Sequence, residues 1–481
     1  MLGRIWSAVV TCRGIGALLF AASLVPFAGA QAAILISSAQ TQNITCSGGT
    51  CTPTADDAVL NVSYLETLLA SVNVTVSTTG SGAQADDIVV NAPFGWSSTN
   101  ALSLDAYESI TINRTVSIAG QSGLSLTTND GGSGGTFSFG RKGHVVFQDI
   151  SSRLAINGAT YTLENSISTL AAAIAANPAG SYALANSYKA SADGTYSESP
   201  IQTTFTGALE GLGNAISHLS VDASGYVGLF SSEEGAIENL GLFNINIIVN
   251  GSSWAGGIAA IGGNLSHVHV TGVIRGRGNS PNSIGGLVGA GGAITNCSAN
   301  VRIIETQPSG IGGLVAASGN IDESYSTGSV SVADDGHVFA GALVAVNSGI
   351  IHDSYATGAV TGGAHSKIGG LVGTNGDGKH ISPGTIETSY AAGAVAGGRH
   401  SKAGGFAGIA YKGGDIQSSY WDTTTSGTEE GMGKGSKRGI TGLTTQQLQS
   451  GLPAGFDPTI WAENPNINGG LPYLIANPPQ N

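Results

Sequence analysis

Charge, proline and cysteine are scarce in this 481-residue sequence, and two of these shortages exclude whole classes of protein. Charged residues make up 10% of the chain, well below the roughly 25% of an ordinary domain. Hydrophobic residues make up 41%, so the chain is not disordered as a whole. The 14 prolines, with no period in the glycines, exclude a collagen triple helix. Glycine is abundant instead, at 75 residues, which predicts a turn-rich, β-rich protein.

Basic residues are also scarce, and they are scattered. The chain has 18 Lys and Arg against 31 Asp and Glu, a formal net charge of −13. Nowhere does the sequence gather Lys and Arg into a cluster. Such an acidic chain is poorly suited to nucleic acid or an anionic membrane, so we expect neither as a partner.

Residues 1–30 are typical of a secretory signal peptide. Arg4 and Arg13 supply positive charge, residues 14–25 a short apolar run, and Ala28-Gly-Ala30 a small-residue cleavage site ending at Ala30. The alternative is an N-terminal buried helix. No later stretch reaches about 18 uninterrupted apolar residues. We therefore expect a secreted protein, extracellular or on the cell surface, with no membrane span once the signal is removed.

Three cysteines follow that segment. Cys46 and Cys51 enclose four turn-forming residues, and in an exported protein this spacing favours a small disulfide loop. Two free thiols are the alternative. Cys297 lies inside a repeat, where we expect a small buried side chain.

A repeat of about 28 residues is the strongest pattern in the sequence. An apolar-flanked glycine recurs with steps of 29, 29, 27, 28, 29 and 35 residues, at Gly228, Gly257, Gly286, Gly313, Gly341, Gly370 and Gly405. An apolar anchor follows each glycine, at Ile237, Leu265, Ile294, Ile321, Ile351, Ile386 and Ile416. Four copies then reach a tyrosine in a shared register, at Tyr325, Tyr355, Tyr390 and Tyr420.

Each copy carries three short apolar runs separated by turn-forming residues, the pattern of strands. One copy cannot bury its own apolar face, whereas stacked copies bury a common core. We therefore predict an all-β fold, a parallel β-helix (solenoid) with about seven rungs, two short helices and a C-terminal cap. The glycines are expected to turn the corners through positive φ. We interpret the tyrosines as a partly buried structural stack; a carbohydrate-binding aromatic strip is the alternative.

The later copies resemble a known family. Gly369-Gly-Leu-Val-Gly-Thr-Asn375, followed by Ile386-Glu-Thr-Ser-Tyr-Ala-Ala-Gly-Ala-Val395, closely resembles the GLUG motif of secreted bacterial proteins. The resemblance covers about residues 280–420 and extends back to 226. The earlier copies depart from it, because Ser298 and His269 stand where later copies have tyrosine.

The region before the repeats, residues 31–160, is β-rich. Runs such as Ser109-Ile-Thr-Ile-Asn113 and Gly123-Leu-Ser-Leu-Thr127 resemble the β-helical shaft of filamentous-haemagglutinin-type adhesins.

Two helices and three boundaries complete the expected organisation. A capping box from Ser63 to Glu66 predicts one helix, and Asn165 or Ser166 begins another within a connector of residues 161–220. The GLUG solenoid then takes residues 221–420. Residues 421–481, which are rich in bulky aromatic side chains, are expected to cap its open end.

The candidate ligand contacts are two histidine–lysine pairs. His365-Ser-Lys367 and His400-Ser-Lys402 fall 35 residues apart in adjacent copies, so they would stack as a small basic strip suited to an acidic glycan. An exposed corner that prefers polar residues is the alternative.

Other candidate chemistry is weaker. His267 and His269 would lie on one side of a strand, and we interpret them as a surface pair because no acidic or cysteine partner is evident nearby. Repeat acids such as Asp322, Asp353 and Asp415 fall one per rung, which indicates solvation rather than catalysis. We assign no catalytic, cofactor-binding or metal-ligating residue.

These observations favour an adhesin-like protein that attaches or presents structure outside the cell and catalyses no reaction. The alternative is a polysaccharide-acting β-helix enzyme, a lyase or a glycosidase. We expect glycans or a host or abiotic surface as partners, and leave an outer-membrane export partner open.

Overall fold

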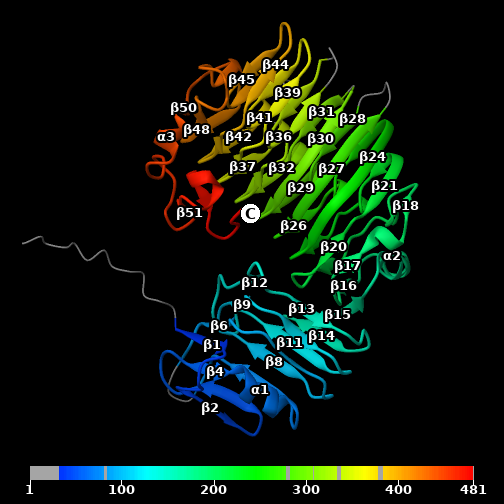
Figure 1. The fold of residues 1–481 in the computed structure, drawn as a ribbon, viewed down its shortest axis with the longest axis vertical. Coiled ribbons are helices and arrows are strands. Elements are labelled where there is room, and N and C mark those ends of the chain that lie inside the picture. The colour runs from blue at the N-terminus through cyan, green and yellow to red at the C-terminus, as the bar shows by residue number, and fades with distance from the viewer. Residues whose placement is uncertain are drawn as a thin grey trace, which may run out of the picture.

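The computed structural model describes residues 32–80, 84–277, 282–306, 308–332, 337–376 and 383–479. It is an all-β protein whose parallel strands coil through about 14 solenoid turns, with three short α-helices (Figure 1). The predicted class is therefore confirmed. The turns outnumber the seven expected because the region before the repeats is coiled as well. In addition, a third helix follows the repeats. The predicted signal peptide and its cleavage site at Ala30 lie outside the described residues.

The first column occupies the blue and cyan part of Figure 1. Alternate residues of its strands point into a separate hydrophobic core. One face consists of β1 (Ala33–Ser37), β4 (Val59–Asn61), β6 (Asp87–Val90), β9 (Ile110–Ile112) and β12 (Phe137–Phe139). A second face consists of β7 (Phe94–Trp96), β10 (Val116–Ile118) and β13 (Val145–Phe147). The third begins with a hairpin of β2 (Ile44–Ser47) and β3 (Thr50–Pro53) and continues through β5 (Val74–Ser77), β8 (Leu102–Asp105), β11 (Gly123–Thr127) and β14 (Arg153–Ile156).

Helix α1 (Val62–Leu69) fills the place of a strand at the start of the second face, next to β7. The helix was predicted, but its cap was not. The side chain of Asn61 accepts hydrogen bonds from the backbone N–H groups of Ser63 and Tyr64. Glu66, expected to complete a capping box, instead accepts a hydrogen bond from the N–H of Gly95 in the next turn.

The two columns are joined end to end by a reversal of strand direction. Strand β15 (Ala159–Glu164) pairs antiparallel with β14 and then parallel with the next strand of the second column. The turn between them has positive φ at Asn157 and Gly158, as a tight hairpin requires. Val145 and Phe147 of the first column also donate backbone hydrogen bonds to Leu212 and Ala185 of the second.

The second column contains the repeats and the largest core, and two long sheets form its walls. Beside β15, the first wall contains β16 (Ser181–Leu184), β19 (Ala208–Glu210), β22 (Phe230–Ser232), β23 (Ala236–Glu238), β25 (Ala259–Ile261), β26 (Asn264–Ser266), β29 (Val288–Thr295), β32 (Val315–Asp322), β36 (Val344–Asn347), β37 (Ile350–His352), β41 (Val372–Asn375), β42 (Thr385–Glu387), β46 (Ala407–Ala410), β47 (Asp415–Gln417) and β49 (Met432–Lys434).

The second wall is a 20-stranded sheet. It contains β17 (Tyr188–Lys189), β18 (Thr195–Tyr196), β20 (Ala215–Ser217), β21 (Ser220–Val227), β24 (Gly241–Ala255), β27 (His269–Arg277), β28 (Asn282–Gly285), β30 (Ser298–Glu305), β31 (Pro308–Gly312), β33 (Tyr325–Ser326), β34 (Val330–Val332), β35 (Phe339–Gly341), β38 (Tyr355–Ala356), β39 (Val360–Gly362), β40 (Lys367–Gly369), β43 (Tyr390–Ala391), β44 (Val395–Gly397), β45 (Lys402–Gly404), β48 (Ser419–Asp422) and β50 (Ile440–Leu443).

Helix α2 (Ile167–Ala176) covers the beginning of the second core. Its three large apolar residues Ile167, Leu170 and Ile174 are buried, and the side chain of Ser166, one of the two predicted start residues, caps it. A short 3₁₀ turn, Ala190–Ala192, follows nearby. Among the described residues, no helix combines the length and the apolar character needed to cross a membrane.

The repeat glycines line up along the column, but Gly228 and Gly341 were each assigned one residue off. Val227 pairs with Ala255 and Ala255 with Ile284, so Gly228 is level with Gly285 and not with Gly286. Gly285, Gly312, Gly341, Gly369 and Gly404 are successive register partners, so Gly341 does not belong with Gly286, Gly313 and Gly370. A Cβ at Gly312 would lie 1.8 Å from the carbonyl oxygen of Val315, and the other four positions are crowded in the same way. Close backbone approach therefore requires these glycines.

Non-glycine residues, contrary to expectation, turn the corner at the end of the first wall. One residue in each copy forms this corner, with φ between +42° and +54°, at Asn239, His267, Asn296, Glu323, Asp353, Thr388 and Ser418. None of Gly286, Gly313 and Gly370 is among the residues with positive φ. The corner residue thus presents a side chain rather than a bare backbone, which makes this corner available for chemistry.

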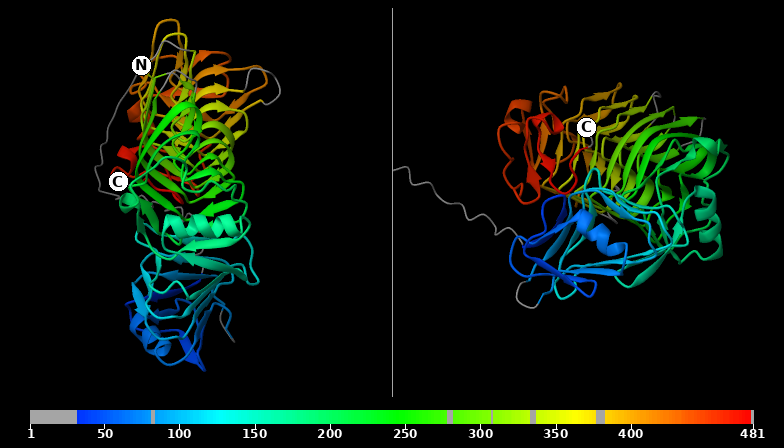
Figure 2. Two further views of the ribbon diagram at one scale, coloured as in Figure 1. Left: turned by 90° about the vertical axis from the view of Figure 1, so that its right-hand side faces the viewer. Right: turned by 60° about the horizontal axis from the view of Figure 1, so that its bottom comes forward.

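The C-terminal segment of residues 444–479, which we call the strap, runs back along the side of the second column. It contains α3 (Thr445–Leu448), β51 (Trp461–Ala462), a 3₁₀ turn (Asn468–Gly470) and β52 (Tyr473–Leu474). The views of Figures 1 and 2 show it, in red, beside the repeat strands. We expected residues 421–481 to cover the open end. Residues 432–443 do add a last turn there, through β49 and β50, but the strap covers a lateral surface.

Candidate functional site

The four tyrosines form a buried ladder beneath the strap. The rings of Tyr325 and Tyr355 stack with centroids 4.8 Å apart, and those of Tyr355 and Tyr390 are 5.0 Å apart and nearly parallel. The hydroxyl of Tyr390 donates a 2.6 Å hydrogen bond to the carbonyl of Pro472 in the strap. Because Tyr355 and Tyr390 have no exposed surface, the ladder is a structural stack and not a carbohydrate-binding strip.

The predicted histidine–lysine strip is present and extends one copy further. Lys367 and Lys402 are register partners, and the rings of His365 and His400 stack with centroids 5.2 Å apart. The ring of His337 lies 5.5 Å from that of His365. We call His337, His365, Lys367, His400 and Lys402 the basic strip. His337 was missed because its copy has phenylalanine, at 339, where the later copies have lysine.

The basic strip runs along the first residues of β40 and β45 and the turns that lead into β35, β40 and β45. All three of its histidines are exposed, as is Lys402. Lys367 is half-buried because its ammonium group lies 4.0 Å from the centroid of the Phe339 ring, and burial lowers its pKa. The strip therefore presents a repeated set of donors at intervals of one rung on a chain that is otherwise acidic.

The repeat acids are not spread apart as the one-per-rung pattern indicated. Asp322 and His352 are register partners, as are His352 and Glu387, so residues from different copies become neighbours. The Nδ1 atom of His352 lies 2.9 Å from Oδ1 of Asp322 and 3.2 Å from Oδ2 of the corner residue Asp353. Because the copies stack, one acid per copy is enough to form a cluster. The acids are therefore not isolated from one another, as their spacing in the sequence had indicated.

This acid–histidine cluster is held as a hydrogen-bonded unit. Hydrogen bonding to Asp322 and the charges of the nearby carboxylates raise the pKa of His352, although burial opposes them. Asp322, His352 and Asp353 each offer a ligand atom, all within 4.8 Å of one another, so they could hold a divalent metal. Asp353 is 3% exposed and lies under the strap, whereas the other two side chains are half-exposed.

A pocket lies where the tyrosine ladder ends. Tyr325 is the register partner of Ser298, which pairs with His269, and His269 pairs with Gly241. The departures from the GLUG pattern at Ser298 and His269 therefore leave space that tyrosine rings fill in later copies. The resulting cavity has a volume of about 400 Å³.

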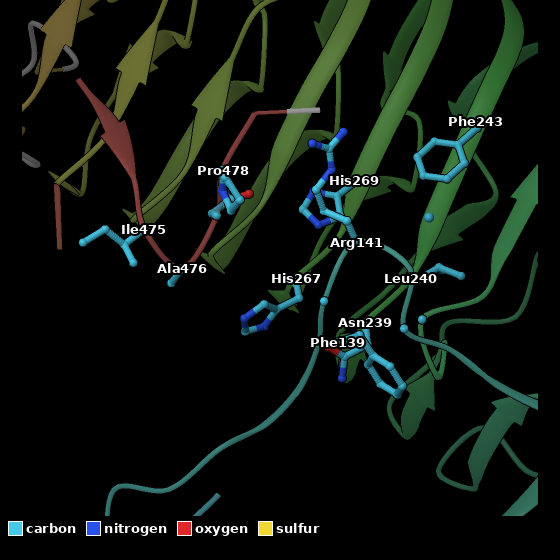
Figure 3. Close-up of a pocket in the computed structure, with 15 residues that line it drawn as sticks. Phe139, Arg141, Asn239, Leu240, Phe243, His267, His269, Ile475, Ala476 and Pro478 are labelled. Atoms are coloured by element: carbon cyan, nitrogen blue, oxygen red, sulfur yellow. The ribbon is translucent and has the colours of Figure 1, made fainter. Parts of the chain in front are cut away.

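Three distant parts of the chain surround this pocket. Phe139 and Arg141 come from the first column, His267, His269 and Phe243 from the repeats, and residues 475–478 from the strap. In Figure 3 the strap residues Ile475, Ala476 and Pro478 stand on one side, and Phe243 and Leu240 on the other.

His267 and His269 do not share the side of a strand as we predicted. His267 is a left-handed corner residue, and His269 begins β27. Burial lowers the pKa of both rings, that of His269 to about 4 with a contribution from the neighbouring His267. Each Nδ1 pairs with a serine hydroxyl, Ser266 for His267 and Ser298 for His269, at 2.9 Å. Both rings therefore stay neutral and keep Nε2 for another partner.

The cysteines have structural surroundings. Cys46 and Cys51 are joined by a disulfide across the β2–β3 hairpin. Cys297 is buried, as predicted, and burial raises the pKa of its thiol to about 12. It begins a ladder of buried side chains, one in each copy. The backbone N–H of each ladder residue donates to the Oγ of the equivalent residue in the following copy, through Ser324, Ser354, Ser389 and Ser419.

Comparison with known proteins agrees with part of this interpretation. The family described as the GLUG motif matches residues 280–304, which include β28, β29 and most of β30. A 91-residue segment, 18% of this chain, is 45% identical to halomucin of Haloquadratum walsbyi, and it covers 1% of that protein. Neither match supports the haemagglutinin-like resemblance of residues 31–160, which stays a prediction. The chain thus carries a GLUG motif on a parallel β-solenoid.

Proposed function

We propose that this protein is a secreted or cell-surface, adhesin-like rod that mediates attachment or structural presentation outside the cell and catalyses no reaction. The observation that carries this proposal is the basic strip, a row of equivalent side chains at successive rungs in which all but Lys367 are exposed. A polymer with regularly spaced negative groups can engage several rungs at once, so weak contacts add up to useful affinity. The GLUG motif and the similarity to a segment of halomucin support an extracellular location.

The expected ligand is an acidic glycan. Ammonium and imidazolium groups bind carboxylate or sulfate groups through charge-assisted hydrogen bonds. The strip histidines are exposed, so their ring nitrogens add further hydrogen-bonding groups at successive rungs.

The test is retention of the intact protein on an immobilised acidic polysaccharide such as polygalacturonate. The double variant Lys367→Gln, Lys402→Gln should lose most of the retention, while the control Lys434→Gln, Lys437→Gln should keep it. Equal retention of both variants would remove the basis of the proposal. An assay for reducing ends or unsaturated products on the same polymer should show no turnover.

A polysaccharide-cleaving enzyme is the second candidate, and the acid–histidine cluster favours it. Asp322 and His352 are half-exposed and hydrogen-bonded, a pair capable of proton transfer. Product release that disappears in both Asp322→Asn and His352→Gln would establish this candidate in place of the first.

A further inference from the structure

We infer that the pocket at the end of the tyrosine ladder binds a carboxylated sugar unit, a uronic acid residue. This inference rests on the proposed function, because it supplies the rod with a specific site for the chain end or side branch of an acidic glycan.

The charge of the lining is the first argument. The chain has 31 acidic and 18 basic residues, yet the 15 residues around the pocket include one arginine and no aspartate or glutamate. Arg141 forms no ion pair with any of the described residues. A guanidinium group binds a carboxylate through two parallel hydrogen bonds, so a carboxylate is the natural partner for this one.

Unused hydrogen-bonding groups are the second argument. The side-chain oxygens of Asn239 and Asn477 are buried and accept no hydrogen bond within the described residues, although both residues lie at the wall of the pocket. Each of the two asparagine side chains is more than nine-tenths buried, and their Nδ2 groups are already engaged, with Glu210 and with backbone carbonyls of the repeats. Buried acceptors without partners are costly, and sugar hydroxyls are donors that would satisfy them.

Shape and polarity distinguish a sugar from a small inorganic anion. A cavity of about 400 Å³ lies within the range of small-molecule sites and far exceeds the needs of phosphate. Phe139 and Phe243 provide apolar surface for the carbon–hydrogen face of a pyranose ring. The neutral rings of His267 and His269 offer Nε2 to hydroxyl groups without adding charge.

The site is built in advance by the fold. His269 is fixed by Ser298, and Asn477 ties the strap to the carbonyls of Cys297 and Glu323 with hydrogen bonds of 3.0 and 3.1 Å. Because the walls come from three packed segments, little ordering is needed when a ligand enters. The pocket therefore suits selective binding of a single unit.

The test measures binding of soluble digalacturonate to the full chain by calorimetry, with digalactose as its neutral counterpart and inorganic phosphate as a bare anion. Digalacturonate should bind, and Arg141→Gln should weaken this binding at least tenfold, a typical effect of losing a charge-assisted pair. His269→Tyr, which restores the tyrosine of later copies, should abolish it by filling the pocket. The exposed control Arg114→Gln should bind like the unmodified protein.

Other results would overturn the inference. Equal affinity for digalactose would exclude carboxylate recognition, and binding of phosphate without digalacturonate would leave only an anion site. Unchanged binding by Arg141→Gln and His269→Tyr, with circular dichroism unchanged, would place the ligand elsewhere. The Lys367→Gln, Lys402→Gln variant should keep digalacturonate binding while losing retention on polymer, so failure of the pocket and failure of the strip are distinguishable.

Discussion

The indole Nε1 of Trp461 donates a 2.8 Å hydrogen bond to Oδ1 of Asp353, a residue 108 positions earlier in the chain. Both side chains are buried, and Asp353 also lies against His352 of the acid–histidine cluster. This contact joins the strap to the repeat column, so the strap both covers the tyrosine ladder and orients the only fully buried member of the cluster.

Removing Trp461 should release the strap. Trp461→Ala deletes a fully buried ring that packs on Phe456 and Tyr390, and it should cost about 3–5 kcal/mol in the free energy of strap undocking. Trp461→Phe keeps most of the packing but leaves the Asp353 carboxylate short of one donor, at about 1–3 kcal/mol. Amide hydrogen exchange of residues 444–479 measures both effects. The exposed control Trp254→Phe should leave the exchange rates of these residues unchanged. Unaltered exchange in Trp461→Ala would show that Trp461 does not hold the strap on the column.

The thiol of Cys297 should be replaceable by a hydroxyl but not by a hydrocarbon. Its Sγ accepts from the N–H of Val268 at 3.4 Å and donates to the carbonyl of Thr295 at 3.2 Å, as serine does in the copies that follow. Cys297→Ser should keep the free energy of unfolding within about 1 kcal/mol, whereas Cys297→Val should lose about 1–3 kcal/mol by stranding the N–H of Val268. The carbonyl of Thr295 keeps its hydrogen bond from the N–H of His267 in both variants. Urea denaturation provides the comparison. Equal stability of the two variants would mean that the ladder hydrogen bonds contribute nothing.

The repeat glycines should tolerate alanine only away from the crowded line. Gly312→Ala puts a Cβ 1.8 Å from the carbonyl oxygen of Val315, and moving the backbone apart should cost more than about 3 kcal/mol. The matched control Gly310→Ala meets only the Cβ of Ala345, at 3.4 Å, and should cost less than about 1 kcal/mol. Thermal unfolding distinguishes them, and similar melting temperatures would contradict the stacking described here.

Stability should fall as the pH rises through neutrality because of Glu210. Burial raises the pKa of this carboxyl to about 8, although hydrogen bonds from Leu212 and Asn239 oppose the shift. Between its ordinary value near 4.5 and about 8, the folded protein binds more protons than the unfolded chain. The free energy of unfolding therefore decreases with rising pH in this window, by at most about 1.4 kcal/mol per unit from this group.

Glu210→Gln should remove that share of the slope. Burial also raises the pKa of Glu233, to about 7, so the relevant quantity is the difference between the variant and the unmodified protein. Denaturation measured from pH 5 to 9 should show the variant gaining relative stability with pH, while the exposed control Glu198→Gln should not. A pH-independent difference would mean that Glu210 is ionised in the folded state.

Much of the fold could be predicted from the sequence, because apolar anchors such as Ile321 and Ile351 recur once in each copy. As expected, these anchors pair between neighbouring rungs. Local signals also predicted α2, since Ser166 and its buried face lie within one segment. Contacts between unlike residues of neighbouring rungs were not predicted from the spacing, in contrast to those between equivalent residues. Asp322 and His352 are 30 residues apart in sequence but directly adjacent in register. The strap and Arg141 reach their sites through tertiary packing, for which the sequence has no periodic signal.

The proposed attachment surface can be observed directly through its histidine rings. In a protein with labelled histidines, titration with polygalacturonate should shift the ring resonances of His337, His365 and His400 together, since these lie on the basic strip. The rings of His144 and His218, which lie outside the strip, should not move. Shifts spread evenly over all histidines, or absent from these three while the polymer binds, would contradict attachment through the strip.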